Sequence, residues 1–267
     1  MSKLKVADLF AGVGGLSQGF ISKGFDIEFA IEHNKEIANS YKLNHPNTTV
    51  YDEDISKIDL NILKEKHPKI DIIVGGPPCQ GFSQKGKRLS IDDERNYLFK
   101  KFIDTVEIFK PKYFVLENVP NILTTANGFF KDEIIKGFEK LGYKVNSSTL
   151  NASDFGVPQN RKRAFFIGSL NGNLLEFPKP YNYKTTIKDA IYDLPFLESG
   201  QGEEFFEYEK KPLSEYQKKL RSKSKGIYNH QSTKHSDLAI ERLKLIPKGM
   251  GKEVLPRKKF IQSSAKT

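Results

Sequence analysis

The sequence predicts an α/β protein with a doubly wound, mostly parallel β-sheet and helices on both faces. Strand and helix patterns alternate up to Gly168, a glycine-rich turn links the first strand to the first helix, and several strands end in polar residues. A chain of 267 residues is long enough for one full domain of this kind with an appendage. We expect one domain over residues 1–195 and a smaller, basic region over 196–267.

The predicted elements are short and follow one another closely. Runs rich in apolar residues predict strands over residues 5–10, 26–31, 49–51, 70–74, 112–116 and 164–168. Apolar residues at helical spacing predict helices over residues 16–23, 35–43, 60–66, 95–109 and 130–141. After a proline-containing break at 177–180, the patterns predict helices over 187–194 and 236–246 and a loop over 199–204.

A strand, a glycine turn and a helix open the chain. Gly12, Gly14 and Gly15 form the turn, and this layout presents backbone amides to a nucleotide-like ligand. An ordinary tight turn has the same composition, and the spacing departs from Gly-x-Gly-x-x-Gly, which argues against nicotinamide. Glu32 ends the next strand, where an acid binds ribose hydroxyls, and a carboxylate of segment 52–55 is placed to meet an adenine amino group. Each acid also fits a solvated loop charge.

The only cysteine, Cys79, follows a strand that looks buried, two glycines and two prolines. The prolines fix the backbone, while Gly75 and Gly76 allow a ligand to approach closely. Free cysteine is often a small buried side chain, but the polar, glycine-containing loop that continues to Arg88 is a poor core segment. Its cations favour a reactive thiolate, so the sequence indicates a nucleophile.

Polar residues also stand at the ends of two later strands. Glu117 and Asn118 follow a predicted strand of the same sheet, and a carboxylic acid near a thiol suggests acid catalysis paired with nucleophilic attack. Arg161 and Arg163 enter the last strand. They are either surface charges or bidentate ligands of a phosphate or a base oxygen.

Four segments resemble, in order and in wording, the catalytic motifs of the bacterial DNA cytosine-5 methyltransferases. They are Asp8–Gly15, Gly76–Ser83, Glu117–Val119 and Gln159–Arg163. The resemblance implies a methyltransferase domain that transfers a methyl group from S-adenosylmethionine to carbon 5 of a cytosine flipped out of double-stranded DNA. It also implies a restriction–modification system and a cytoplasmic location.

The resemblance assigns a role to each motif residue. Cys79 would add to carbon 6 of the base, and Glu117 would protonate ring nitrogen 3 or hydrogen-bond to it. Asn118 would orient Glu117, and Arg161 and Arg163 would hold the base and its phosphate. Further substrate contacts implied are Gln80, Ser83 and Gln159. The cofactor residues implied are Phe10, Ala11, Gly12, Gly14, Gly15, Leu16, Glu32, Asp54, Ile55, Pro77 and Leu98.

Charge and composition agree with a DNA substrate. The net charge is +10, and from Lys210 onward 16 Lys and Arg stand against 4 Asp and Glu. This predicts a phosphate-facing surface in a partial target-recognition region, although a solvated face also produces such a run. One cysteine leaves no disulfide and no zinc framework, so we expect no metal. We see no secretory leader and no apolar run long enough to span a membrane.

The chain departs from the family's pattern after Lys252, where the rest of the recognition domain and the closing cofactor motifs are not found. The leading interpretation is an active DNA methyltransferase that needs a second polypeptide for its missing end. The alternatives are an inactive remnant or fragment, and a transfer-RNA cytosine methyltransferase of the same fold. An assay on transfer RNA against duplex DNA separates the last of these from the first.

Overall fold

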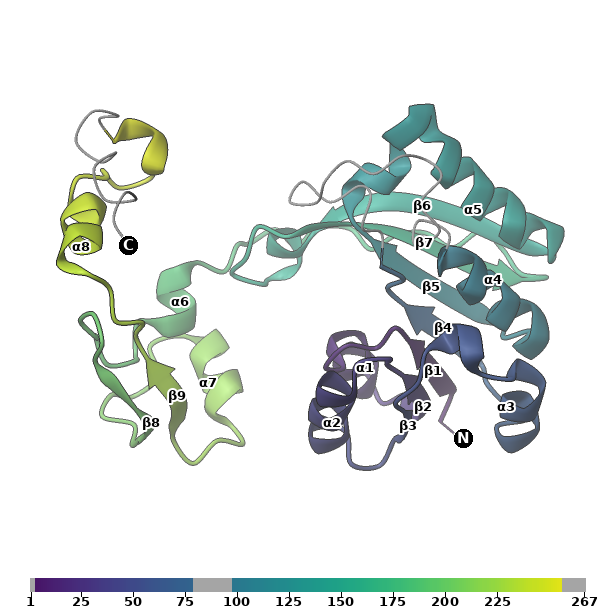
Figure 1. Ribbon diagram of the computed structural model, residues 1–267, viewed down its shortest axis with the longest axis horizontal. Helices are drawn as coiled ribbons and strands as arrows, with labels where there is room; N and C mark the ends of the chain where they lie inside the picture. The colour runs from purple at the N-terminus through teal and green to yellow at the C-terminus, as the bar shows by residue number, and fades with distance from the viewer. Residues whose placement is uncertain (1–2, 79–97, 256–267) are drawn as a thin grey trace, which may run out of the picture. The chain divides into compact units, whose positions relative to one another are not determined.

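The computed structural model describes residues 3–78 and 98–255, and this part of the chain forms two compact units. The first unit ends at Lys184 and the second begins at Thr185 (Figure 1). The first unit contains the sheet and the motif residues that the structure describes. The second unit is small and has a sheet of its own.

The first unit is built on one seven-stranded sheet with the strand order β3-β2-β1-β4-β5-β7-β6 (Figure 1). The strands are β1 (Lys5–Leu9), β2 (Asp26–Ile31), β3 (Thr49–Tyr51), β4 (Ile72–Gly75), β5 (Tyr113–Asn118), β6 (Tyr143–Asn151) and β7 (Lys162–Leu170). Every neighbouring pair from β3 to β5 is parallel, whereas β7 runs antiparallel to both β5 and β6. The predicted α/β fold with a mostly parallel sheet is therefore confirmed.

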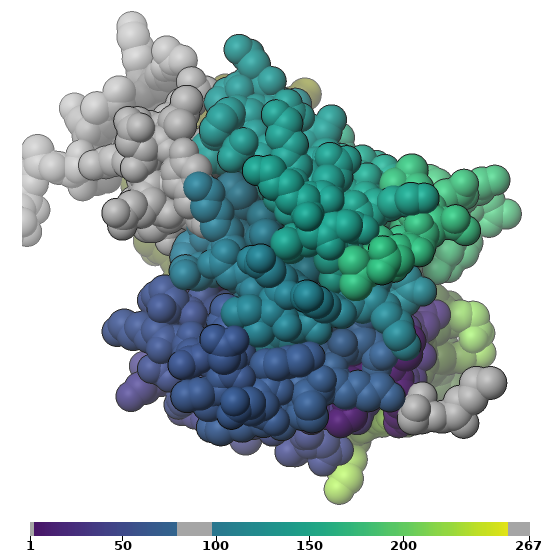
Figure 2. All heavy atoms as spheres, turned by 90° about the vertical axis from the view of Figure 1, so that its right-hand side faces the viewer, coloured from purple at the N-terminus to yellow at the C-terminus, as the bar shows by residue number. Residues whose placement is uncertain are grey.

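Helices cover both faces of this sheet. They are α1 (Gly15–Ile21), α2 (Lys35–Asn44), α3 (Leu60–Lys66), α4 (Leu98–Phe109) and α5 (Phe129–Lys140). The main core joins Leu9, Phe114 and Phe166 of the sheet to Leu63, Phe102 and Phe138 of α3, α4 and α5. Residues of α1 and α2 pack with the opposite face, against strand residues such as Val6 and Ala30. In the space-filling view, the blue segments up to α3 and the teal segments from α4 onward lie directly against one another (Figure 2).

Short 3-10 helices connect these elements and shape their ends. They are η1 (Ile55–Lys57), η3 (Pro120–Leu123), η4 (Thr125–Gly128), η5 (Ala152–Phe155) and, in the second unit, η6 (Lys252–Val254). Asn34 and Asp59 cap α2 and α3, because each side chain accepts hydrogen bonds from two backbone amides of the first turn. These caps fix where both helices begin.

The sequence analysis did not predict strand β6, and it assigned a loop to a segment in which a strand begins. Of the nine residues of β6 only Tyr143 is buried, because β6 forms an edge of the sheet and carries polar residues such as Ser147 and Ser148. Residues 199–204 were expected to be a loop, but strand β8 (Gly202–Phe206) begins within that range and pairs with strand β9 (Ile227–Gln231). The pairing supplies backbone hydrogen bonds that the local sequence does not reveal.

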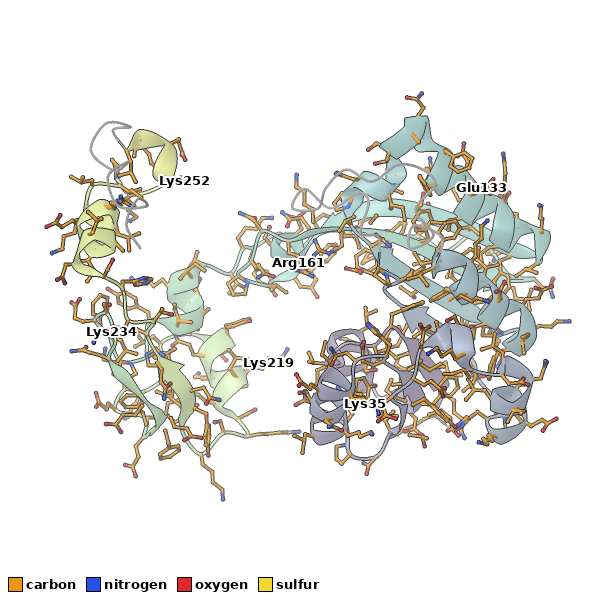
Figure 3. The ribbon with its side chains drawn as sticks, viewed as in Figure 1. Lys35, Glu133, Arg161, Lys219, Lys234 and Lys252 are labelled. Carbon is orange, nitrogen blue, oxygen red and sulfur yellow. The ribbon has the colours of Figure 1, made fainter. Side chains whose placement is uncertain are left out.

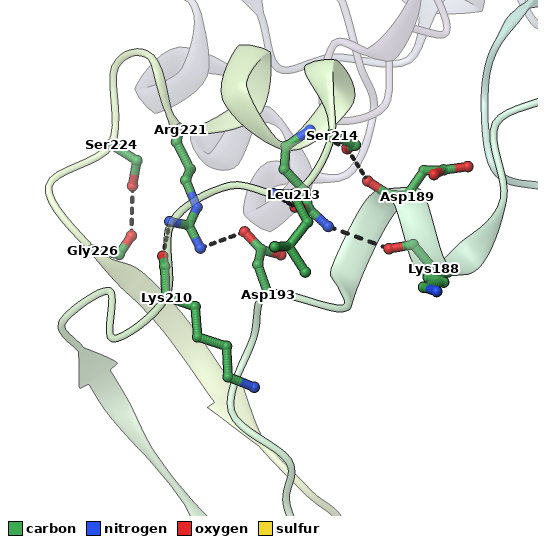
Figure 4. Close-up of polar contacts among 10 residues, drawn as sticks. Lys188, Asp189, Asp193, Lys210, Leu213, Ser214, Arg221, Ser224 and Gly226 are labelled. Carbon is green, nitrogen blue, oxygen red and sulfur yellow. Dashed lines mark hydrogen bonds and ion pairs between the residues drawn. The ribbon is translucent and has the colours of Figure 1, made fainter.

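The second unit combines an antiparallel pair of strands with three α-helices. They are α6 (Ile187–Ile191), β8 (Gly202–Phe206), α7 (Glu215–Arg221), β9 (Ile227–Gln231) and α8 (Asp237–Lys244). A buried ion pair joins the Arg221 guanidinium to the Asp193 carboxylate (Figure 4). The same guanidinium lies 3.9 Å from the ring centroid of Tyr208. Gln217 donates a hydrogen bond from Nε2 to the Lys188 carbonyl at 3.2 Å, which ties α7 to α6. Within the described residues, no helix combines the length and apolar character needed to cross a membrane.

Candidate active site

Two cavities lie at the carboxyl ends of the parallel strands of the first unit, and Phe10 lines both of them. The larger, which we call the reaction cavity, has a volume of about 400 Å³. It is lined by Phe10, Ala11, Gly15, Leu16, Gly76, Glu117, Leu150, Ala152, Arg161, Arg163 and Phe165. The smaller, which we call the second cavity, has a volume of about 270 Å³ and is lined by Phe10, Ile31, His33, Glu53, Asp54, Ile55, Pro78 and Leu98.

The glycine turn between β1 and α1 forms the wall that the two cavities share. Its backbone has positive φ at Phe10 (56°), Gly12 (57°) and Gly14 (91°). For a bulky residue such as Phe10 this conformation is strained, and strain of this kind concentrates at ligand sites. A side chain at position 14 would lie 2.1 Å from Nε2 of His45, so only glycine lets the turn rest on α2.

The Glu32 side chain holds the glycine turn by accepting a hydrogen bond from the backbone of the turn. Its Oε2 atom accepts a hydrogen bond from the Gly12 amide at 3.0 Å, and Oε1 accepts one from the Asn34 amide at 2.9 Å. The side chain is buried and does not line either cavity. In this structure the carboxylate therefore orders the loop that the sequence predicted to bind a nucleotide.

A buried polar chain lies beneath the same turn. The Ser17 hydroxyl donates to Asp8 Oδ2 at 2.6 Å and lies 2.6 Å from the Tyr41 hydroxyl. These residues come from α1, β1 and α2, so the chain joins three elements around the turn. Burial raises the pKa of Asp8 to about 7, against the opposing effect of its hydrogen bonds with Ser17.

Glu117 is the acid of the reaction cavity. Its Oε1 atom lies 2.9 Å from Nε of Arg163, and both side chains are about three quarters buried. Burial raises the pKa of Glu117 above its ordinary value, although the charges of Arg163 and Arg161 act in the opposite direction. A Cβ atom at Gly76 would lie 2.9 Å from Oε2 of Glu117. Glycine at this position therefore leaves the space that the Glu117 carboxyl group occupies.

Asn118 does not contact Glu117 through a hydrogen bond. Its Nδ2 atom donates to the Pro77 carbonyl at 2.8 Å, and its Oδ1 atom accepts from the Val119 amide at 2.8 Å. The residue is buried. Asn118 therefore fixes the backbone two residues before Cys79, the predicted nucleophile.

The second cavity has an apolar interior and an acidic end. Ile55 is buried, and Leu98 begins the described part of α4 beside it. Asp54 caps η1, because its Oδ1 atom accepts hydrogen bonds from the Ser56 amide at 2.9 Å and the Ser56 hydroxyl at 2.8 Å. The backbone hydrogen bond from Ser56, with its hydroxyl, lowers the pKa of Asp54, so the carboxylate stays ionised.

The structure brings most of the predicted residues that it describes to these two cavities. The residues expected for the cofactor that line a cavity are Phe10, Ala11, Gly15, Leu16, Asp54, Ile55 and Leu98. Pro77 is buried against Asn118, and its neighbour Pro78 lines the second cavity instead. Gln159 is exposed in the turn before β7 and lines neither cavity. Cys79, Gln80 and Ser83 lie outside the described residues.

Several lining residues escaped the sequence analysis. They are Ile31, His33, Pro78, Leu150, Ala152 and Phe165. Ile31, His33 and Pro78 each lie at a predicted strand end or in a motif, a signal that could have identified them. Leu150 belongs to β6, the strand that the sequence analysis did not predict, and Ala152 follows it. Arg161 lines the reaction cavity and lies at the end of the β6–β7 pair, away from Glu133 on α5 (Figure 3).

Among the described residues, no group of three or more His, Cys, Asp or Glu side chains could hold a metal ion.

The chain is similar to known DNA methyltransferases over most of its length. The family model for C-5 cytosine-specific DNA methylase matches residues 4–264. Type II methyltransferase M.DdeI of Desulfomicrobium norvegicum is 41% identical over 256 residues, which are 92% of this chain and 61% of that protein. Type II methyltransferase M1.HphI of Haemophilus parahaemolyticus is 37% identical over 258 residues, covering 95% of this chain and 63% of that protein. The chain thus spans about three fifths of the length of these two relatives.

A solved structure supports the same relationship. The crystal structure of a protein described as a DNA modification methyltransferase encoded within an E. coli prophage superposes with a TM-score of 0.80 at 30% sequence identity. The match covers 94% of this chain and 78% of that chain.

Proposed function

The chain belongs to the C-5 cytosine-specific DNA methylase family, and we propose that it transfers a methyl group from S-adenosylmethionine to carbon 5 of cytosine in double-stranded DNA. The observation that carries the proposal is the place of Glu117, a buried carboxyl group with a raised pKa. It lines the reaction cavity together with the glycine turn and two arginines. This arrangement supports proton donation to a base held beside a cofactor.

The two cavities fit the two ends of S-adenosylmethionine. We propose that the second cavity takes the adenosine, with Asp54 accepting from the adenine amino group and Ile55 and Leu98 packing on the ring. The turn at Phe10 and Gly15 would then direct the methionine part toward the reaction cavity, which both residues line. When bound, the cofactor supplies an electrophilic methyl group.

The chemistry on the base would use two residues of this chain. The thiolate of Cys79 adds to carbon 6 of the cytosine and makes carbon 5 nucleophilic. Burial raises the pKa of Glu117, which favours its protonated form, and Glu117 donates its proton, or a strong hydrogen bond, to ring nitrogen 3. Carbon 5 then takes the methyl group and gives its proton to solvent water. The proton on ring nitrogen 3 returns to Glu117, and the Cys79 sulfur leaves as a thiolate as the ring regains its aromaticity.

The neighbouring residues would position these two groups. Arg163 holds the Glu117 carboxyl at 2.9 Å, and Arg161 lines the same cavity with its charge free to meet a phosphate or a base oxygen. Asn118 fixes the Pro77 carbonyl and thereby the start of the segment that carries Cys79. This role differs from the one the resemblance implied, which was to orient Glu117.

We further propose that the basic second unit contributes phosphate contacts with DNA, that the enzyme belongs to a restriction–modification system, and that it acts in the cytoplasm. The printed names of the relatives, type II methyltransferases, support the second point. The charge excess from Lys210 onward supports the first.

The proposal is tested by trapping the covalent step. Duplex DNA of mixed sequence with 5-fluorocytosine in place of cytosine should form a covalent adduct with the protein, because fluorine does not leave as a proton does. The reaction contains S-adenosylmethionine and the second polypeptide that the chain is expected to need. Cys79→Ala should form none. An adduct of equal yield with Cys79→Ala would remove Cys79 from the mechanism.

A tritiated-methyl assay separates the remaining alternatives. Transfer to duplex DNA and not to transfer RNA is the expected result, and the reverse would favour the transfer-RNA alternative. The assay is run with these 267 residues alone and with a second polypeptide that carries the remaining part of a relative's length. Full transfer by the 267 residues alone would contradict the expected need for a second chain.

A further inference from the structure

An exposed cluster of aromatic side chains lies beside the reaction cavity. The rings of Tyr181 and Tyr183 stack with centroids 5.3 Å apart and an interplanar angle of 21°, and Phe155 meets Tyr181 edge-on at 6.1 Å. Tyr181 is 50% exposed and Tyr183 is 56% exposed, so the stacked pair presents ring surface outward. Val157 beside them is 41% exposed. Gathered exposed rings of this kind mark a binding surface more often than a chance arrangement.

The cluster is held firmly in place by the turn that follows β6. The Tyr181 amide donates to the Asp154 carbonyl at 2.8 Å, and Lys184 forms an ion pair with the Asp154 carboxylate. Gly156 has a φ of +78°, and a Cβ atom there would lie 3.2 Å from the Tyr183 hydroxyl, so the ring packs directly on the turn. The two tyrosines therefore have little conformational entropy to lose when a ligand binds.

The same turn connects the aromatic pair to the reaction cavity. Phe155 and Asp154 belong to η5, whose first residue, Ala152, lines that cavity. The Ala152 amide donates to the carbonyl of Arg161, another lining residue, at 3.0 Å. One end of this short segment thus borders the cavity, and its other end carries Phe155, whose ring contacts that of Tyr181.

The surrounding charge favours a nucleic acid over a protein partner. From Asp154 to Lys184 the basic residues are Arg161, Lys162, Arg163, Lys179 and Lys184, and the acids are Asp154, which pairs with Lys184, and Glu176. Lys162 and Lys179 are exposed. Aromatic rings stack on nucleobases of any sequence, and adjacent cations bind the backbone phosphates.

We propose that Tyr181 and Tyr183 form an aromatic platform for a nucleotide next to the base held in the reaction cavity. The proposal rests on the proposed function, because it takes that base to be a cytosine drawn out of duplex DNA. Neighbouring nucleotides are covalently joined to the extruded one, so they lie at the rim of the cavity, where the platform is. Stacking there compensates part of the stacking lost when the cytosine leaves the duplex.

The platform is tested by binding alone, with no need for turnover. Fluorescence anisotropy compares a fully paired duplex of mixed sequence with the same duplex carrying one unpaired cytosine. We expect the unmodified protein to prefer the second probe. Tyr181→Ala and Tyr183→Ala should each reduce this preference by roughly 5-fold or more, the lower end of what base–aromatic stacking contributes. Tyr181→Phe and Tyr183→Phe keep the rings and should retain it.

Tyr113→Ala is the matched control, because Tyr113 is also an exposed tyrosine of the first unit but begins β5 at the opposite edge of the sheet. It should leave the preference unchanged. Alanine variants that keep the preference, or phenylalanine variants that lose it equally, would overturn the platform. So would unchanged binding with a lowered melting temperature, which would make the rings part of an internal contact.

Methyl transfer measured in parallel separates the two proposals. If the unmodified protein methylates DNA while the alanine variants bind both probes as it does, only the platform fails. If the unmodified protein methylates transfer RNA and not DNA, the proposed function fails, and a ring-dependent preference for the unpaired cytosine would still support the platform.

Discussion

Nε of Arg163 lies 2.9 Å from Oε1 of Glu117, and yet the pKa of Glu117 is raised. An adjacent cation ordinarily favours the ionised carboxylate, but here the loss of solvation outweighs it. The contact gives the carboxyl group a fixed orientation, and its burial shifts the pKa in the direction that an acid catalyst needs. This pair leads to the first two of five predictions.

The first concerns the Glu117 proton. Glu117→Gln keeps the shape of the side chain but removes the proton donor. It should lower methyl transfer by roughly two to four orders of magnitude, the usual contribution of a positioned acid or base, while affinity for S-adenosylmethionine changes little. Single-turnover kinetics and calorimetry measure the two quantities. An exposed glutamate of α5 supplies a control, since Glu139→Gln should leave turnover close to normal. Unchanged turnover in Glu117→Gln would exclude the role.

The second concerns the pH dependence set by Arg163. Transfer requires protonated Glu117, so it should decline as pH rises through the raised pKa of that group. Arg163→Gln removes a charge that lowers this pKa, so the pKa should rise further and the decline should move to higher pH, even though the maximal rate is smaller. A pH–rate profile of each variant gives the midpoint. A shift to lower pH would contradict the assignment.

The third concerns two adjacent glycines with different surroundings. A Cβ atom at Gly75 would lie 2.3 Å from the Leu9 carbonyl oxygen, a backbone atom of β1, so Gly75→Ala should destabilise the protein by about 1–3 kcal/mol. At Gly76 the clash is with the movable Glu117 carboxyl. Gly76→Ala should therefore leave the melting temperature nearly unchanged and slow transfer by about 10-fold or more.

Gly19→Ala is the control for this pair, because a Cβ atom there meets nothing within 4 Å inside α1. It should raise stability by up to about 1 kcal/mol and leave transfer unaffected. Equal melting temperatures for Gly75→Ala and Gly76→Ala would show that the strand spacing is less rigid than the structure indicates.

The fourth concerns the hold of Asn118 on Pro77. Asn118→Asp at neutral pH replaces the donating Nδ2 by an oxygen that repels the Pro77 carbonyl. The rate of the 5-fluorocytosine adduct at Cys79 should fall, with little change in cofactor affinity. Asn146→Asp breaks a similar bond, from Nδ2 to the Leu175 carbonyl at 2.9 Å, away from the cavity lining, and should not slow the adduct. Similar adduct rates in both variants would refute the positioning role.

The fifth concerns stability and Asp8. The pKa of this buried carboxyl is about 7 in the folded protein against an ordinary value of 3.8, so between these pH values the folded state binds more protons than the unfolded state. The free energy of unfolding should therefore fall as pH rises from about 4 to 7, by at most about 1.4 kcal/mol per pH unit from this group.

Asp8→Asn keeps a neutral group of the same size. It should flatten the dependence of the unfolding free energy on pH between about pH 4 and 7. Asp26→Asn, at an exposed aspartate of β2, should not. Denaturant titrations at several pH values provide the measurement. A slope that persists in Asp8→Asn would assign it to other groups.

The sequence was sufficient for the elements with clear periodicity. The strand predicted over 26–31 is β2 as observed, and the helices predicted over 35–43 and 60–66 match α2 and α3 to within one residue. A strand that buries one face has an apolar residue at every second position, and a helix that buries one stripe has apolar residues at a spacing of about 3.6 residues. Both patterns can be read from the local sequence. The edge strand β6 was missed because an edge position tolerates polar residues on both faces.

The sequence by itself also determined which chemical groups the site contains, since Glu117 and the glycine turn stand at strand ends in a recognisable order. Only the tertiary structure decided how they meet. Arg163 stands at the beginning of β7, and a parallel β7 would carry it to the opposite edge of the sheet from Glu117. The strand runs antiparallel to β5, with Glu117 opposite Phe165, and this brings Arg163 beside the carboxyl group. Strand direction is set by long-range pairing and packing, which a local pattern of residues does not encode.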